Sequence, residues 1–149
     1  MQSVFNISDN DNIMERISKL TSSSRPQWGK MNVAQMFAHC RQPLRVGTGE
    51  LVLKQSFIGL IFGKMMKKKF LSDKGFGKNL PTDKKFIITD SRDFDREKAD
   101  LISLISAYKT KGPSIIKNEK HPFFGKMTPG EWGILSWKHL DHHLRQFGV

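Results

Sequence analysis

The chain of 149 residues has a single cysteine, Cys40, which excludes an internal disulfide bond. A lone thiol suits a reducing compartment. No apolar run approaches the roughly 20 residues that a membrane-spanning helix needs, and the longest, Ser56–Met66, is followed by lysines. The opening residues also lack the basic and apolar regions of a secretory signal peptide. We therefore expect a cytoplasmic protein without a membrane span.

Acidic residues are scarce as well. Asp and Glu number 14 against 25 Lys and Arg, which leaves a net charge of +11. Such a charge attracts polyanions, but neither a helix-turn-helix nor an aromatic RNA-binding pattern accompanies it. A basic nucleic-acid-binding module is therefore the less favoured alternative. We interpret the basic middle of the chain as a solvated helix end and loop, with an anion-binding rim as the functional alternative: Lys64, Lys67–Lys69, Lys74, Lys78, Lys84 and Lys85.

What the chain does contain is helical periodicity, with apolar residues three and four positions apart in several segments. Asn32 is expected to be the N-cap of the second helix, and Pro43 to bend or end it. The other expected elements are helices over Ser8–Leu20, Leu51–Phe70 and Asp93–Tyr108, breaks at Thr21–Pro26 and Gly47–Gly49, loops over Ser72–Pro81 and Ser114–Met127, and an extended segment at Phe86–Ile88.

The final helix has the clearest start signal. Thr128 as N-cap, Pro129 at the first helical position and Glu131 two positions later form a capping box. The helix is expected to continue to about Phe147. Four or five helices joined by long loops, without a repeat or a linker, predict an all-α fold: one helical-bundle domain over residues 1–149, with a short extra helix or extended segment.

Three of the five histidines lie in this last helix, at positions 139, 142 and 143. His139 and His143 are four residues apart and share one helix face with Trp132. Imidazole is the commonest metal ligand in proteins, and many catalytic sites have three protein ligands and an open position. His39, in the second helix, is the candidate third ligand. His142 competes with His143, since spacing alone does not decide between them.

Other interpretations of these residues stay open. A lone histidine on an apolar face, such as His39, is also typical of a hydrogen-bonded core position, and histidines near a helix end complement its dipole. His121, before Pro122, is interpreted as structural or as a surface residue. Cys40 is interpreted as a small buried residue. A second apolar side of the last helix, formed by Ile134, Trp137 and Leu144, predicts burial against another helix of the bundle or a second subunit.

Three segments also carry a resemblance to a known family: Trp28–His39, with a Trp-containing entry into a helix that ends in histidine; His121–Trp132; and His139–Gln146, with H-x-x-x-H followed by a near Gln. In these segments the chain resembles the DinB/YfiT-like superfamily of metal-binding four-helix bundles. The middle, about Gly47–Ile116, is similar only in helical character. Arg145 departs from the family pattern, which often has Gly before the near Gln.

The resemblance implies a DinB-like up-down four-helix bundle that binds a divalent metal, Zn or Ni, through His39, His139 and His143. Gln146 would act catalytically by orienting water or substrate, and Trp132 would form the pocket wall. The implied activity is thiol transfer to an electrophile or hydrolysis of a small molecule, in a homodimer with a low-molecular-weight thiol as partner. The absence of a clear general base weakens the hydrolase version. The alternative is a non-enzymatic metal- or ligand-binding protein on the same fold.

Overall fold

The computed structural model describes residues 1–72, 76–78 and 80–149. This part of the chain is predominantly helical, with one two-stranded antiparallel hairpin, which confirms the expected all-α class. The elements in chain order are α1 (Ile7–Ser18), α2 (Val33–Thr48), α3 (Phe57–Leu71), the 3₁₀ turn η1 (Lys84–Phe86), α4 (Phe94–Lys111), the 3₁₀ turn η2 (Gly112–Ile115), β1 (Lys120–His121), β2 (Gly125–Lys126) and α5 (Pro129–Gln146).

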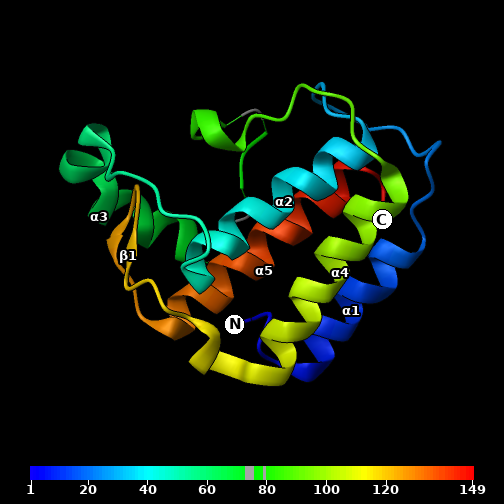
Figure 1. The fold of residues 1–149 in the computed structure, drawn as a ribbon. Helices are drawn as coiled ribbons and strands as arrows, with labels where there is room; N and C mark the ends of the chain where they lie inside the picture. Colours follow the sequence, from blue (N-terminus) through cyan, green and yellow to red (C-terminus); the bar gives the residue numbers. More distant parts are fainter. Residues whose placement is uncertain (73–75, 79) are drawn as a thin grey trace.

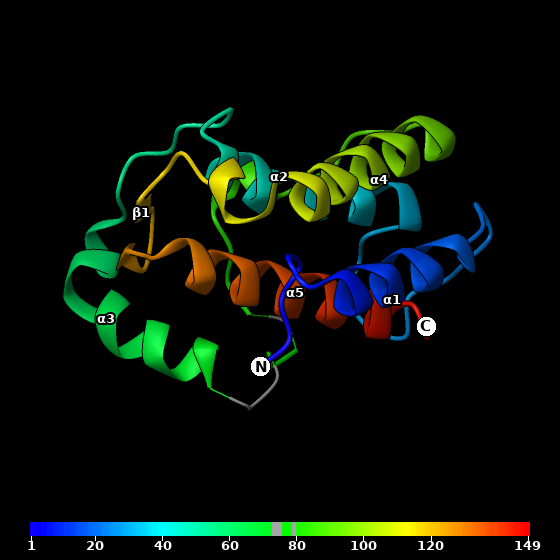
Figure 2. The same ribbon diagram turned by 90° about the horizontal axis from the view of Figure 1, so that it is seen from below.

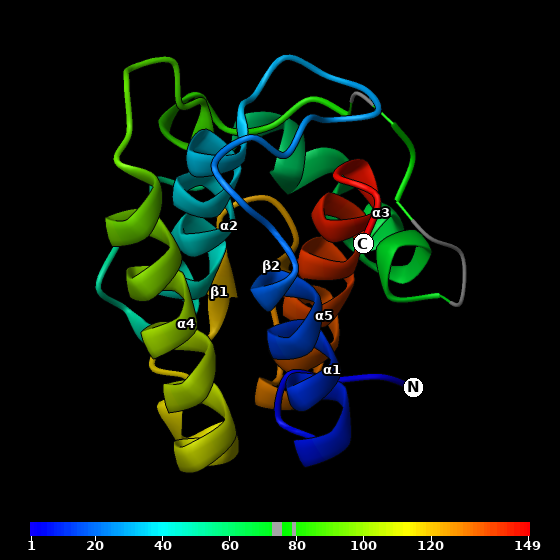
Figure 3. The same ribbon diagram turned by 90° about the vertical axis from the view of Figure 1, so that its right-hand side faces the viewer.

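Four helices form a bundle. Both α2 and α1 pack against α4 and against α5, so each of the four has two neighbours. Figure 1 shows α2 crossing in front of α5, and Figure 3 shows α4 beside α2 and α1 beside α5. Their apolar stripes meet in one core, in which Ile13, Phe37, Ile105 and Tyr108 are fully buried. Burial of these stripes removes apolar surface from water and is the main favourable contribution to folding.

The third helix, α3, lies outside this bundle and contacts α5 and β2 (Figure 2). Its outward apolar side chains are exposed, Phe57 by 75% and Ile61 by 60%. Among the described residues, every helix is too short or too polar to cross a bilayer. The second apolar side of α5 has its partners within the chain, since Trp137 and Leu144 belong to the bundle core.

Helix caps are where sequence and structure agree best. Asn32 accepts a hydrogen bond from the backbone N–H of Gln35 at 2.9 Å, and the Gln35 side chain in turn accepts one from the backbone N–H of Asn32. Thr128 and Glu131 form the same reciprocal pair at the start of α5. Each pair satisfies backbone donors that a helix N-terminus leaves free. The predicted starts of both helices are confirmed.

Two predicted boundaries differ from the structure. Pro43 does not end helix α2, which continues to Thr48 and ends at Gly49, within the predicted break and with a left-handed φ of 80°. Buried packing of Leu44 and Val46 beyond the proline offsets the hydrogen bond that it removes. Helix α3 starts at Phe57, after an N-cap at Ser56, rather than near Leu51.

The structure also differs from the prediction in the segments Phe86–Ile88 and Ser114–Met127. Phe86 closes a 3₁₀ turn, and Ile87 and Ile88 follow without strand pairing. The expected loop after α4 contains η2 and the β1–β2 hairpin. The loop expected over residues 72–81 lies partly outside the described residues, and Lys74 of the basic segment lies outside them entirely.

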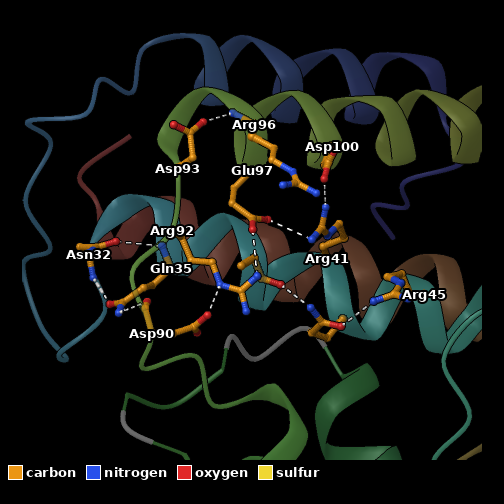
Figure 4. A network of polar contacts seen from close by, with 12 residues as sticks. Asn32, Gln35, Arg41, Arg45, Asp90, Arg92, Asp93, Arg96, Glu97 and Asp100 are labelled. Atoms are coloured by element: carbon orange, nitrogen blue, oxygen red, sulfur yellow. Dashed lines mark hydrogen bonds and ion pairs between the residues drawn. The ribbon is translucent and has the colours of Figure 1, made fainter.

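A network of ion pairs joins α2 to α4 and to the segment that enters α4 (Figure 4). Arg41 of α2 points at Glu97 and Asp100 of α4, and Arg92 pairs with Glu97 and Asp90. Glu97 is only 4% exposed, so its two arginine partners compensate a carboxylate that burial would otherwise penalise. The network holds α2, and with it His39, in place against the bundle.

Candidate metal centre

Three histidines from two helices converge where α2 packs on α5. His39 lies in α2, and His139 and His143 lie one turn apart in α5. One ring nitrogen from each can be chosen so that all three lie within 4.8 Å of one another. The Nε2 atoms of His39 and His139 are 3.1 Å apart. The helical spacing of four residues explains why His139 and His143 reach the same point.

The backbone determines which nitrogen of His39 is available. Its Nδ1 lies 2.8 Å from the carbonyl oxygen of Phe86. A carbonyl only accepts, so Nδ1 carries the proton and Nε2 presents its lone pair to the other histidines. Ligand histidines in metal sites commonly donate their second N–H to a carbonyl in this way. The 3₁₀ turn that contains Phe86 therefore orients His39.

A second chain of hydrogen bonds orients His143. The side-chain nitrogen of Gln146 donates to the carbonyl oxygen of Trp28 at 2.6 Å, so the amide oxygen faces the opposite way. That oxygen lies 2.8 Å from Nδ1 of His143 and accepts a hydrogen bond from it. His143 thus has its lone pair on Nε2. Gln146 acts through His143 here, and its predicted role in orienting water or substrate stays a prediction.

Burial keeps these imidazoles neutral. It lowers the pKa of His39, partly offset by the hydrogen bond to Phe86. It lowers the pKa of His143 to about 3, with the nearby His39 acting in the same direction and the bond to Gln146 opposing. The pKa of His139 falls well below its usual value because of burial and the neighbouring histidines. A metal needs the neutral form of imidazole, which this environment maintains.

The other candidates lie outside the group of three. His142 is half-buried and its ring contacts those of Trp28 and Phe76, at centroid distances of 5.8 and 5.9 Å. His121 accepts hydrogen bonds at Nδ1 from the backbone N–H groups of Phe123 and Phe124. Cys40 is fully buried, which raises the pKa of its thiol and keeps it protonated.

The three histidines border a cavity of about 1030 Å³. Its walls come from α5, α2, the inner face of α3, the β1–β2 turn and the segment around η1. Trp132, predicted as the pocket wall, lines it from α5 and is completely buried. Its ring lies 5.1 Å from that of His121. A further ligand of a metal ion held by the histidines would therefore lie beside a large, partly open cavity.

The donor set fits a divalent metal ion. A tetrahedral zinc bound at about 2.0–2.1 Å holds its ligand nitrogens roughly 3.3–3.4 Å apart. The Nε2 atoms of His39 and His139 already lie 3.1 Å apart, and the third ligand nitrogen lies within 4.8 Å. Three imidazoles would fill three of the four positions of a tetrahedral ion, which leaves the fourth for another ligand. These histidines could therefore hold a metal and leave room for another ligand.

Two backbone groups that orient the histidines could not be identified from the sequence. The carbonyl groups of Phe86 and Trp28 orient His39 and His143, directly and through Gln146. Every residue has a backbone carbonyl, so no sequence pattern distinguishes these two. Their role depends on where distant segments meet in the folded chain.

Residues 2–148 match the family described as "Protein of unknown function (DUF1569)". No curated protein and no solved structure matches the chain.

Proposed function

This chain belongs to the DUF1569 family, and we propose that it is a metal-dependent enzyme that binds Zn or Ni through His39, His139 and His143. The observation that carries the proposal is the paired orientation of two ligand rings. The Phe86 carbonyl and the Gln146 amide oxygen accept hydrogen bonds from Nδ1 of His39 and His143, which leaves Nε2 of both rings unprotonated. In the metal-free protein Nε2 of His39 accepts a hydrogen bond from Nε2 of His139, which a metal ion would replace. Two separate hydrogen-bond chains that expose convergent nitrogens are typical of a metal site.

The chemistry that we propose is activation of a thiol or a water molecule at the open position. A bound divalent ion would lower the pKa of either group and make it nucleophilic near neutral pH. Among the described residues that line the cavity, the one carboxylate is Asp83, which is exposed. Hydrolysis would need a base to move protons during the reaction. The lining has no buried carboxylate for this role, but it includes the half-buried imidazole of His142. We favour thiol transfer to an electrophile, with hydrolysis as the second reaction.

The remaining parts of the proposal come from the resemblance. We propose that the four packed helices adopt the DinB-like up-down arrangement, and that a low-molecular-weight thiol is one substrate. A homodimer also stays a prediction, and the exposed apolar residues of α3 are available for its interface. The ring contacts of His142 with Trp28 and Phe76 support a role beside the ligands rather than among them.

Zinc binding by single-residue variants tests the proposal. Calorimetric titration of metal-free protein should give one zinc per chain. Replacement of any one ligand should weaken zinc binding at least about 100-fold, because the ion then keeps only two protein ligands. The three variants are His39→Ala, His139→Ala and His143→Ala. His142→Ala is the matched control, one residue from a ligand on the same helix, and should keep the wild-type affinity.

Two results would contradict the proposal. The first is wild-type protein that takes up neither zinc nor nickel while its circular dichroism spectrum shows a folded, helical chain. The second is loss of binding in His142→Ala with binding retained in His143→Ala, which would move the ligand role from His143 to His142. Thermal unfolding of each metal-free variant separates a lost ligand from a lost fold.

A further inference from the structure

The side chains that line the cavity indicate the chemical class of the substrate, which the three histidines alone do not. Resting on the proposed metal centre, we infer that the organic substrate is an uncharged, apolar molecule, aromatic or branched aliphatic, that fills the cavity and reaches the metal with one donor or reacting atom. This inference concerns the electrophile and not the low-molecular-weight thiol that the resemblance implies.

Aromatic side chains form a continuous wall that begins at the candidate ligands. The ring of Phe76 lies 6.3 Å from that of His139, and the ring of Phe70 lies 4.8 Å from that of Phe76. Phe124 follows at 5.4 Å from Phe70. These are the centroid spacings of packed aromatic side chains. A flat apolar group next to the metal would pack against this wall.

The other side of the cavity is apolar as well. Leu135 lies one turn before His139 in α5 and is 7% exposed. Phe86 and Ile88, each 8% exposed, line the cavity from the segment around η1. A substrate that packs against these groups loses its contact with water over the surface that it buries there. Burial of apolar surface is favourable, whereas burial of a charge without a partner is costly.

Charged partners inside the cavity are few. Among its described lining residues, Lys30 and Asp83 are the groups with a full charge at neutral pH, and both are exposed. An anionic part of a substrate, away from the bound metal ion, would therefore have no charged partner among the buried lining residues that the structure describes. The strong positive charge of the chain lies elsewhere, for example on the exposed lysines at the end of α3.

The size of the cavity points to a substrate rather than to a metal with water alone. Pockets for drug-sized ligands span about 300–1,000 Å³, and this cavity measures about 1030 Å³. A single water molecule occupies about 30 Å³ of liquid volume. If water alone filled this apolar cavity, the side chains of its lining would lose most of the van der Waals contacts that they could make with a substrate.

Three probes test the inference on zinc-loaded protein at pH about 8, where imidazoles are neutral. Each contains an imidazole ring whose unprotonated nitrogen can bind the metal. They are imidazole, 4-phenylimidazole and the anionic imidazole-4-acetate. Calorimetry should give 4-phenylimidazole at least a tenfold higher affinity than imidazole, because its phenyl ring leaves water. Imidazole-4-acetate should bind no more tightly than imidazole.

A pair of variants on one helix locates the effect. Phe70→Gln replaces part of the aromatic wall and should remove most of the preference for 4-phenylimidazole, while zinc and imidazole affinities stay unchanged. Ile61→Gln changes an apolar residue of the same helix that is 60% exposed and outside the cavity lining, so all affinities should stay as in the wild type. Thermal unfolding verifies that both variants fold.

The outcomes separate the two proposals. If zinc binds but imidazole-4-acetate binds as tightly as 4-phenylimidazole, the inference about the substrate is overturned and the metal centre stands. Equal affinities of imidazole and 4-phenylimidazole in the wild type would overturn that inference as well. If zinc does not bind at all, the proposed function fails, and the inference that rests on it fails too.

Discussion

Gln146 illustrates how a single side chain can orient a candidate metal ligand through hydrogen bonds. Its nitrogen donates to the carbonyl of Trp28, and its oxygen accepts from His143. The first bond determines which end of the amide faces His143, and the second determines which nitrogen of His143 carries the proton. Gln146 is 4% exposed, so both bonds lie away from competing water.

Replacement of Gln146 by leucine should therefore weaken zinc binding without abolishing it. The volume is retained, but Nδ1 of His143 loses its acceptor, and partners of this kind contribute about 10–100-fold to metal affinity. Competition titration with a chromophoric chelator measures the change. Arg145→Ala, at the exposed neighbouring position, should leave the affinity unchanged. Wild-type affinity in Gln146→Leu would contradict the positioning role.

At the scale of elements, the attachment of α3 depends on two glycines. A Cβ at Gly59 or Gly63 would collide with the backbone carbonyl of Phe123 in the β1–β2 turn. The absence of a side chain at both positions lets the helix approach the hairpin backbone directly. Because α3 carries Phe70 and the hairpin carries Phe124, this close contact also brings together two sides of the aromatic wall.

Gly63→Ala should accordingly separate α3 from the hairpin. We expect a loss of about 1–3 kcal/mol in the free energy of unfolding, the usual cost of an extra methyl group without space, and weaker binding of 4-phenylimidazole. Zinc affinity should not change, because the three histidines lie on α2 and α5. Urea denaturation and calorimetry measure these effects.

Gly130→Ala is the control, since an added Cβ there meets only the Thr128 hydroxyl at 4.0 Å. It should be neutral or stabilise by up to about 1 kcal/mol, as alanine usually does within a helix. Equal stability losses in both variants would contradict the account of α3.

An element could be predicted from the sequence when the interactions that form it lie within a few residues of one another. The starts of α2 and α5 depend on residues three positions apart, Asn32 with Gln35 and Thr128 with Glu131, so the sequence was sufficient. The continuation of α2 past Pro43 depends on tertiary packing of Leu44 and Val46, which local pattern does not contain. Phe86 is apolar and β-prone, yet its segment forms a 3₁₀ turn whose carbonyl binds His39.

For the whole molecule, several buried neutral histidines make stability depend on pH. Burial lowers the pKa of His121 and His143 to about 3 in the folded chain, against 6.5 when exposed. Between these values the unfolded chain binds more protons than the folded one, so stability falls as the pH falls. The stabilisation is fully present above pH 6.5 and is lost progressively toward pH 3.

Metal-free protein should therefore become less stable on acidification from pH 7 to pH 4, which urea denaturation at each pH measures. Each such histidine contributes a slope of up to about 1.4 kcal/mol per pH unit. His121→Asn removes one titrating group, keeps a side-chain acceptor for the turn, and should reduce the slope by up to that amount. A stability that stays constant from pH 7 to pH 5 would show that these histidines are not buried in the folded chain.

The sequence by itself determined the helical class, the caps, and the pair of histidines one turn apart on the last helix. These depend on interactions within a few residues, where the period of the helix alone sets the geometry. It left His142 and His143 as rivals and His39 as a candidate third ligand. Only the tertiary structure brought His39 to His139 and His143, because that requires α2 to pack on α5 a hundred residues later. The ring orientations and the apolar cavity likewise arise from contacts between distant segments, which no local pattern contains.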